Sequence, residues 1–231
     1  MSSVQGTDMG YVDTDSRLPW IRADETVAET IVFHHGVAAH SGMWSGWDAA
    51  LGDFFRLVKL DMRGHGATAV PDGYAWTLDA LVEDLGSVVE AADLAQFHLV
   101  GESIGGTVAL AYAARHPDRV KTLTISNGAH RGAPITNLAP WGDIIASDGM
   151  GGWSDFMMGM RFFEGALDEM QQRWYRDQQA QPDGAVVLAL AAALAATDLT
   201  DELPNVNLPT LLLHPDSSPF ISVALMAELL D

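Results

Sequence analysis

The sequence contains no cysteine, few basic residues and no long apolar run. Without cysteine there is no disulfide framework of the kind that small exported domains need, so we expect a cytoplasmic protein. No apolar stretch approaches the roughly 18 residues that cross a bilayer, and the first ten residues, MSSVQGTDMG, have neither the basic nor the apolar region of a secretory signal. These absences favour a soluble globular chain with no membrane partner.

Basic residues are scarce: 12 Lys and Arg stand against 31 Asp and Glu, and the net charge is −19. Such a charge repels a phosphate backbone at long range, which argues against a nucleic-acid partner. The acidic residues are scattered over all 231 positions, a pattern typical of a solvated surface. We therefore expect a small-molecule substrate, and homodimer formation stays open.

What the sequence does contain is an alternation of short Val/Ile/Leu-rich runs with longer segments of helical period. This alternation predicts an α/β protein with a mostly parallel sheet that helices cover on both faces. The predicted strands are residues 29–35, 55–61, 97–101, 120–126 and 210–214, with an antiparallel hairpin from residues 11–13 and 19–22 before them. The predicted helices are residues 43–53, 77–93, 104–114, 186–196 and 221–231, and Thr77 is the expected N-cap of the second.

The alternation breaks off after His130, and no strand of similar quality follows until Pro209. An all-helical insertion between two strands predicts a cap of roughly 70 residues at the carboxyl edge of the sheet. We therefore expect a discontinuous core of residues 1–130 and 202–231 and a helical cap of residues 131–201.

The motif with the clearest chemistry is Gly101-Glu102-Ser103-Ile104-Gly105. It follows the strand FHLV and opens the apolar helix IGGTVALAYAAR, which is the strand, tight turn and helix that G-x-S-x-G requires. The glycines permit the sharp turn, and Ser103 is left at a helix N-terminus, where free N–H groups favour negative charge on a reacting acyl oxygen. Ser103 is the predicted nucleophile.

From about residue 9 onward, the sequence resembles the α/β-hydrolase family. His35-Gly36 is similar to that family's oxyanion-loop HG, and residues 61–66, DMRGHG, are similar to its D-x-R-G-x-G turn. The resemblance implies that the backbone N–H groups of Val37 and Ile104 form the oxyanion hole of a tetrahedral intermediate. It gives Arg63 and His65 a structural role in the turn.

The acid of the triad is where the sequence departs from the family. The family's acid ends a segment similar to HGDxDP, and this chain has His214-Pro215-Asp216-Ser217-Ser218-Pro219 instead. Aligning the prolines puts Ser218 in the place of the acid, and Asp216 is the nearest carboxylate. Asp216 is our candidate acid, and a role as a loop cap is the alternative.

The base is not identified among the eight histidines. In the family it lies on a loop one strand after the acid, and the sequence ends at Asp231, inside the helix that should precede that strand. We therefore expect the printed sequence to be part of a longer protein in which the last strand, a helix and the histidine follow.

Further candidates lie on loops expected near the active edge. His35, His40, Trp44, His130, Arg131 and Trp153 are candidate pocket residues. Arg131 is either a ligand of a substrate carboxylate or a surface arginine. The apolar set Trp153, Met157, Met158, Met160, Phe162 and Phe163 forms either a substrate wall or the core of the cap. No metal-ligand spacing and no dinucleotide fingerprint is present, so neither a metal nor a cofactor is predicted.

The run HPDRV, the segment SNGA and the short helical cap resemble the 3-oxoadipate enol-lactonase and carboxylesterase branch of the family. That resemblance implies a serine hydrolase that cleaves a carboxylic ester or lactone through an acyl-enzyme. Two alternatives stay open: a carbon–carbon bond hydrolase of the meta-cleavage-product type, and a catalytically silent binding protein with the same fold.

Overall fold

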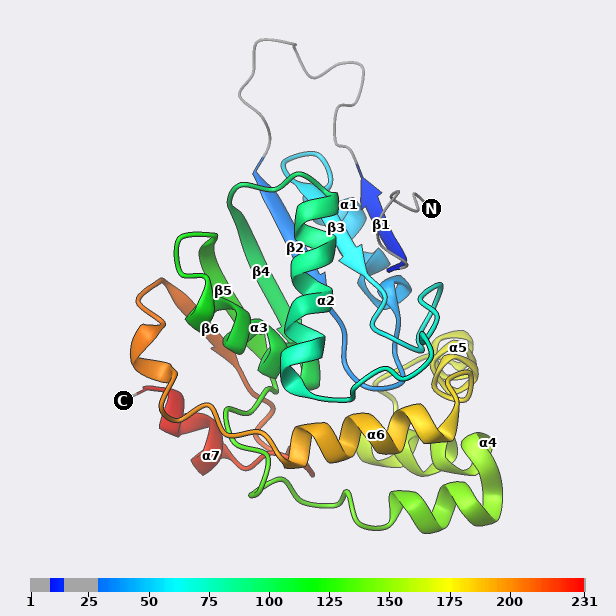
Figure 1. The fold of residues 1–231 in the computed structure, drawn as a ribbon. Helices are drawn as coiled ribbons and strands as arrows, with labels where there is room; N and C mark the ends of the chain where they lie inside the picture. Colours follow the sequence, from blue (N-terminus) through cyan, green and yellow to red (C-terminus); the bar gives the residue numbers. More distant parts are fainter. Residues whose placement is uncertain (1–8, 15–28, 231) are drawn as a thin grey trace.

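The computed structural model describes residues 9–14 and 29–230, which form a six-stranded sheet with helices around it (Figure 1). The strand order is β1-β3-β2-β4-β5-β6. The strands are β1 (Tyr11–Thr14), β2 (Thr30–His34), β3 (Arg56–Leu60), β4 (Phe97–Glu102), β5 (Val120–Ser126) and β6 (Thr210–Leu213). β1 runs antiparallel to β3, and every other neighbouring pair is parallel. The predicted fold class is confirmed.

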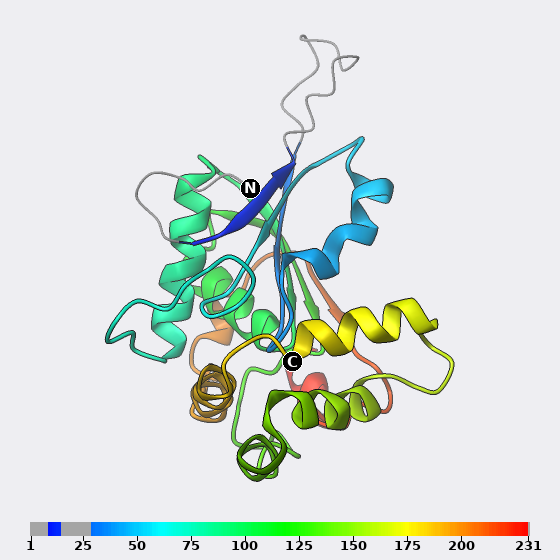
Figure 2. The same cartoon turned by 90° about the vertical axis from the view of Figure 1, so that its right-hand side faces the viewer.

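Helices cover both faces of the sheet, α2 (Leu78–Ala91) and α3 (Ile104–Arg115) on one face and η1 (Ser41–Trp47) with α1 (Asp48–Leu51) on the other (Figure 2). The Thr77 side chain caps α2 by accepting a hydrogen bond from the Ala80 N–H at 3.2 Å. The apolar stripe of α2 is buried in the main core, and almost every residue of α3 is buried beside it. The core therefore forms between β4, α2 and α3 and fixes the position of the β4–α3 turn.

Three helices lie between β5 and β6 in sequence and beyond the carboxyl ends of the strands in space (Figure 1). They are α4 (Trp141–Arg161), α5 (Glu169–Gln179) and α6 (Gly184–Ala195). α4 is broken at Gly149, whose φ of +67° is outside the helical region and is favourable only for glycine. These inserted helices match the predicted all-helical segment, and the cap boundaries at 131 and 201 stay a prediction.

Several predicted boundaries were wrong. Residues 43–53 do not form one helix: a 3-10 helix, η1, is followed by the single turn of α1, in a segment with glycine at 42, 46 and 52. The first arm of the predicted hairpin is β1, but it pairs with β3, and the second arm, 19–22, lies outside the described residues. The last predicted helix is the shorter α7 (Val223–Ala227) followed by η3 (Glu228–Leu230); η2 (Leu203–Asn205) precedes β6.

Candidate active site

Ser103 occupies a strained turn between β4 and α3. Its φ of +55° and ψ of −127° are a conformation that non-glycine residues rarely adopt and that costs about 1–3 kcal/mol. The Ser103 N–H donates to the Ser126 carbonyl at 2.9 Å, and the Ser103 carbonyl accepts from Gly106 at 2.8 Å. The turn is therefore held from β5 and from the first turn of α3, with the serine side chain at the helix N-terminus.

Two glycines let the strand and the helix approach closely enough for this turn. A Cβ atom on Gly105 would lie 2.5 Å from the backbone carbonyl oxygens of His34 and His35. A Cβ atom on Gly101 would lie 2.7 Å from the Cα atom of Gly106. Backbone atoms cannot move aside as a flexible side chain can, so the packing of β2, β4 and α3 requires glycine at both positions.

Two backbone N–H groups near Ser103, those of Val37 and Ile104, are candidates for an oxyanion hole. Val37 and Ile104 are buried, and neither N–H is engaged by another residue within the described part of the chain. Ile104 is the first residue of α3, where N–H groups have no intrahelical partner. The arrangement is the one expected for an oxyanion hole, although the role of both residues remains a prediction.

Neutral imidazoles support the loop that carries Val37. His65 Nε2 accepts from the Ala38 N–H at 2.9 Å, and its Nδ1–H donates to the Arg63 carbonyl at 2.9 Å. His35 Nε2 accepts from the Met62 N–H at 2.9 Å, and its Nδ1–H donates to the Gly36 carbonyl at 2.8 Å. Burial lowers the pKa of His65 to about 4 and holds the pKa of His35 well below its usual value. Both rings are therefore fixed as neutral hydrogen-bonding supports, and neither is placed to act as a base.

The D-x-R-G-x-G turn is anchored by its charged residues. The Asp61 carboxylate accepts from the Ser41 N–H at 2.7 Å and from the Ala67 N–H at 2.9 Å. The Arg63 guanidinium forms a buried ion pair with Asp84 of α2 at 2.9 Å. These contacts join the turn to the start of η1 on one side and to α2 on the other, which agrees with the structural role predicted for Arg63.

A cavity of about 620 Å³ opens in front of Ser103. Its floor comes from the oxyanion loop and the ends of β4 and β5, including Val37, Ser103, Ser126 and Asn127. Its roof comes from the inserted helices and is largely apolar: Trp141, Met157, Met160, Phe162, Phe163, Ala191 and Leu194. A volume of this size and an apolar wall suit a small organic substrate.

Only two charged side chains are among the described residues that line this cavity, Glu102 and Arg161. The Glu102 carboxylate accepts a hydrogen bond from the Gly36 N–H, and burial raises its pKa while Arg161 and that hydrogen bond oppose the increase. Burial lowers the pKa of Arg161, and Glu102 opposes that decrease. The cavity thus contains a carboxylate and a guanidinium near Ser103, and each favours the charged form of the other.

The geometry fits the match to a protein family. The family model described as the alpha/beta hydrolase fold matches residues 29–184, more than half of the chain. The chain belongs to the α/β-hydrolase family.

Individual relatives in this family are hydrolases of several kinds. The chain is 27% identical over 208 residues to 3-oxoadipate enol-lactonase 1 of Acinetobacter baylyi, a match that covers 85% of this chain and 74% of that protein. It is 34% identical over 113 residues to 2-hydroxymuconate semialdehyde hydrolase of Pseudomonas sp., covering 47% and 40% of the two chains. The crystal structure of the enol-lactonase from Burkholderia xenovorans LB400 superposes with a TM-score of 0.84 at 26% identity, covering 99% of this chain and 85% of that one.

Within this α/β-hydrolase, most of the predicted pocket residues lie away from the cavity. Trp153 is fully buried in the core, where the centre of its ring lies 5.1 Å from the centre of the Trp141 ring. Trp44 of η1 packs on Phe33 of β2, with the centres of the two rings 5.0 Å apart. The centre of the His40 ring lies 5.5 Å from the centre of the Trp174 ring, and neither residue lines the cavity. None of these three aromatic side chains is among the residues that line the cavity.

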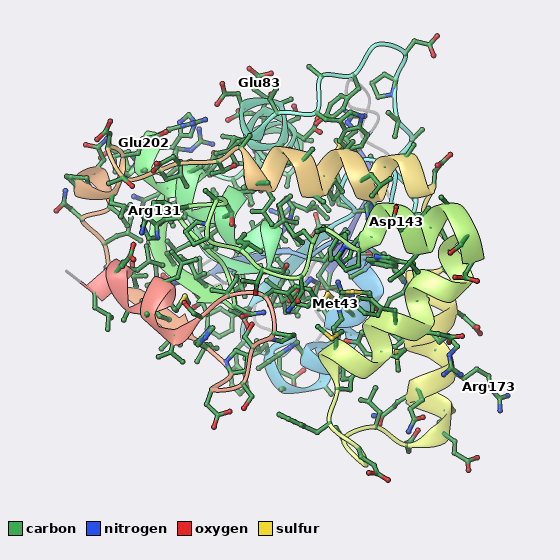
Figure 3. The ribbon with its side chains drawn as sticks, turned by 90° about the horizontal axis from the view of Figure 1, so that it is seen from below. Met43, Glu83, Arg131, Asp143, Arg173 and Glu202 are labelled. Atoms are coloured by element: carbon green, nitrogen blue, oxygen red, sulfur yellow. The ribbon has the colours of Figure 1, made fainter. Side chains whose placement is uncertain are left out.

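Arg131 and His130 also lie outside the cavity lining, beside α7 and η3. Figure 3 shows Arg131 far from Met43, a residue of the cavity wall. Arg131 forms an ion pair with Glu228, and His130 Nε2 lies 3.2 Å from the same carboxylate. Because Glu228 already engages both side chains, the structure does not support a substrate-binding role for Arg131 or a pocket position for His130.

The predicted apolar wall is divided between two roles. Met157, Met160, Phe162 and Phe163 line the cavity, whereas Trp153 belongs to the core and Met158 does not line the cavity. α4 is broken at Gly149, and its second half, which ends at Arg161, contributes Met157 and Met160 to the cavity wall.

The structure does not bring Asp216 to Ser103. Asp216 is exposed, its carboxylate accepts a hydrogen bond from the Ser217 hydroxyl at 3.1 Å, and it does not line the cavity. Ser217 and Ser218 do line it, and the Ser218 hydroxyl accepts from the Ile221 N–H at 3.2 Å. This placement favours the alternative of a loop residue over the triad acid.

No histidine is among the described residues that line the cavity, so the structure offers no base from its wall.

Within residues 9–14 and 29–230, no group of three or more potential ligand side chains could hold a metal ion. No described helix is long and apolar enough to cross a membrane.

Sequence reasoning missed Glu102, Arg161 and Tyr175 as cavity residues. Glu102 is the variable position before the serine of the G-x-S-x-G motif, so the motif itself could have indicated it. The second is the single charged residue in the apolar run FMMGMRFF, and an isolated charge in such a run is a signal of a specific partner. Nothing in the local sequence around Tyr175 marks it.

Proposed function

We propose that this chain is a serine hydrolase that cleaves a carboxylic ester or a lactone of a small molecule. The observation that carries the proposal is the position of Ser103, on a strained turn at a helix N-terminus, facing a cavity beside the Val37 N–H. The similarity to 3-oxoadipate enol-lactonase 1 over 85% of the chain supports the ester and lactone class.

In the proposed reaction the Ser103 hydroxyl oxygen attacks the substrate carbonyl carbon and gives up its proton to a base. Negative charge then develops on the carbonyl oxygen, and the N–H groups of Val37 and Ile104 stabilise it. The alkoxide leaving group departs with a proton, an acyl-enzyme remains on Ser103, and water releases the acid. We assign neither the base nor the acid of this cycle to a residue of the cavity wall.

The test is covalent labelling of Ser103 combined with ester hydrolysis. A fluorophosphonate should label the full chain at Ser103, as peptide mass spectrometry would locate, and Ser103→Ala should remove the label. The same variant should lower the hydrolysis of nitrophenyl acetate by several orders of magnitude with an unchanged circular dichroism spectrum. Retention of more than about a tenth of the rate would remove Ser103 from this role.

A carbon–carbon bond hydrolase is the second candidate, because 2-hydroxymuconate semialdehyde hydrolase is a relative over 47% of the chain. Turnover of a meta-cleavage-type dienoate in preference to nitrophenyl acetate, with both activities lost in Ser103→Ala, would favour it. If the fluorophosphonate labels nothing in the full-length protein and that protein consumes neither substrate, it is a binding protein with the hydrolase fold.

A further inference from the structure

Arg161 connects the inserted helices to the oxyanion loop. It is the last residue of α4, and one terminal nitrogen of its guanidinium donates to Gln179 Oε1 of α5 at 2.7 Å. The other terminal nitrogen donates to the Val37 carbonyl oxygen at 2.9 Å, across 124 residues of sequence. The Arg161 Cζ atom also lies 6.0 Å from the centre of the buried Trp153 ring. The side chain thus connects α4 and α5 to the carbonyl oxygen of Val37.

The hydrogen bond to Val37 fixes one particular peptide group. The peptide between Val37 and Ala38 offers its oxygen to Arg161 and its N–H to His65 Nε2, so it is held at both ends. Ala38 has a φ of +56°, a region that a residue with a Cβ atom enters only at a cost. A strained residue keeps such a conformation only where its surroundings hold it. The two side chains therefore supply the restraint that this loop needs.

The charge of Arg161 has its counterpart in Glu102, the last residue of β4. Glu102 precedes the nucleophile, is the main favourable charge felt by Arg161, and accepts from the Gly36 N–H. A buried guanidinium without an opposite charge would be strongly unfavourable. Glu102 and Arg161 thus hold two consecutive loop residues, Gly36 through its N–H and Val37 through its carbonyl.

We propose that Arg161 is a positioning residue for the Ser103 reaction, which clamps the Val37–Ala38 peptide and thereby orients the adjoining Gly36–Val37 peptide, whose N–H points at the acyl oxygen. This inference rests on the proposed function. It gives the inserted helices a direct part in oxyanion stabilisation, since the clamp forms only when the end of α4 lies over the loop. Arg161 acts through the backbone of Val37 and not by contacting the substrate.

The test compares Arg161→Met with Arg161→Lys and with the control Arg173→Met in the full chain. Arg173 is exposed on α5 and points away from the rest of the structure (Figure 3). The first measurement is amide hydrogen exchange by NMR at Ala38, whose N–H donates to His65 Nε2, and at Ala39, whose N–H donates to the Gly36 carbonyl. Loss of a hydrogen bond to a charged donor corresponds to about a tenfold or greater change in the opening equilibrium, so Arg161→Met should speed exchange by at least about tenfold.

The second measurement is hydrolysis of two nitrophenyl esters, one neutral and one with a free carboxylate. If Arg161 positions the oxyanion loop, Arg161→Met should lower kcat for both esters by about tenfold to a hundredfold and change KM by less than about twofold. Arg161→Lys keeps the charge near Glu102 but reaches fewer acceptors, so its kcat should be intermediate. Arg173→Met should match the parent chain in both measurements.

Three results would overturn the proposal. An unchanged exchange rate at Ala38 and Ala39 in a folded Arg161→Met chain would show that the clamp does not hold the loop. An increase in KM confined to the carboxylate-bearing ester would make Arg161 a substrate-binding residue instead. If Arg161→Met does not fold, exchange at Ala38 in Arg161→Lys decides, and a rate equal to that of the parent chain counts against the clamp. Absent hydrolysis by the parent chain would refute the proposed function, whereas the exchange data would still judge the clamp.

Discussion

Acid should destabilise this protein through its buried neutral imidazoles. His34 and His65 are almost fully buried, and burial lowers the pKa of each to about 4. In the unfolded chain a histidine has a pKa of about 6.5, so below that pH the unfolded state binds protons that the native state does not. The free energy of unfolding therefore decreases as the pH falls from about 6.5 toward 4, and each group stops contributing to the decrease below its native pKa.

The size of the effect follows from these pKa values. Between about pH 7 and about pH 5, one histidine whose pKa changes from about 6.5 to about 4 on folding contributes a loss of about 2 kcal/mol. The replacement His65→Gln removes the titrating group, and the amide keeps an acceptor for the Ala38 N–H and a donor for the Arg63 carbonyl. The pH dependence of the variant should be smaller by about 2 kcal/mol, whatever its stability at neutral pH.

Urea unfolding followed by tryptophan fluorescence at about pH 7 and about pH 5 measures this difference. His116 is exposed at the end of α3, so His116→Gln serves as the matched control and should keep the pH dependence of the parent chain. If His65→Gln lost as much stability between the two pH values as the parent chain does, the imidazole would not be held neutral by burial, and the reasoning would fail.

Two further substitutions test the site. Gly105→Ala places a Cβ atom 2.5 Å from the carbonyl oxygens of His34 and His35. It should lower the free energy of unfolding by about 3 kcal/mol and abolish fluorophosphonate labelling of Ser103. Normal labelling with unchanged stability would refute the close packing. Asp216→Asn alters an exposed loop residue, so the free energy of unfolding should change by less than about 0.5 kcal/mol and the rate of ester hydrolysis by less than about twofold. A decrease of the rate by about 10⁴-fold would restore Asp216 as the triad acid.

The sequence determined the fold and the turn that carries Ser103 because both depend on local patterns. Short Val/Ile/Leu runs predicted five strands of the sheet to within two residues, and Thr77 marked the start of α2. The elbow was readable for the same reason: strand, glycine, serine, glycine and helix lie within one continuous segment, and its strained backbone follows from local sterics. Periodicity and turn chemistry are short-range properties, so a single sequence carries them.

Only the tertiary structure decided which side chains face the cavity. Trp153 and Met157 lie one helical turn apart on α4, yet Trp153 is sealed in the core and Met157 reaches the cavity wall. The exposure of Asp216 beside the inward-lying Ser218 depends on how one loop turns. Arg161 reaches the Val37 carbonyl across 124 residues. Such contacts are set by how the inserted helices pack over the strand ends, and no local pattern encodes that long-range geometry.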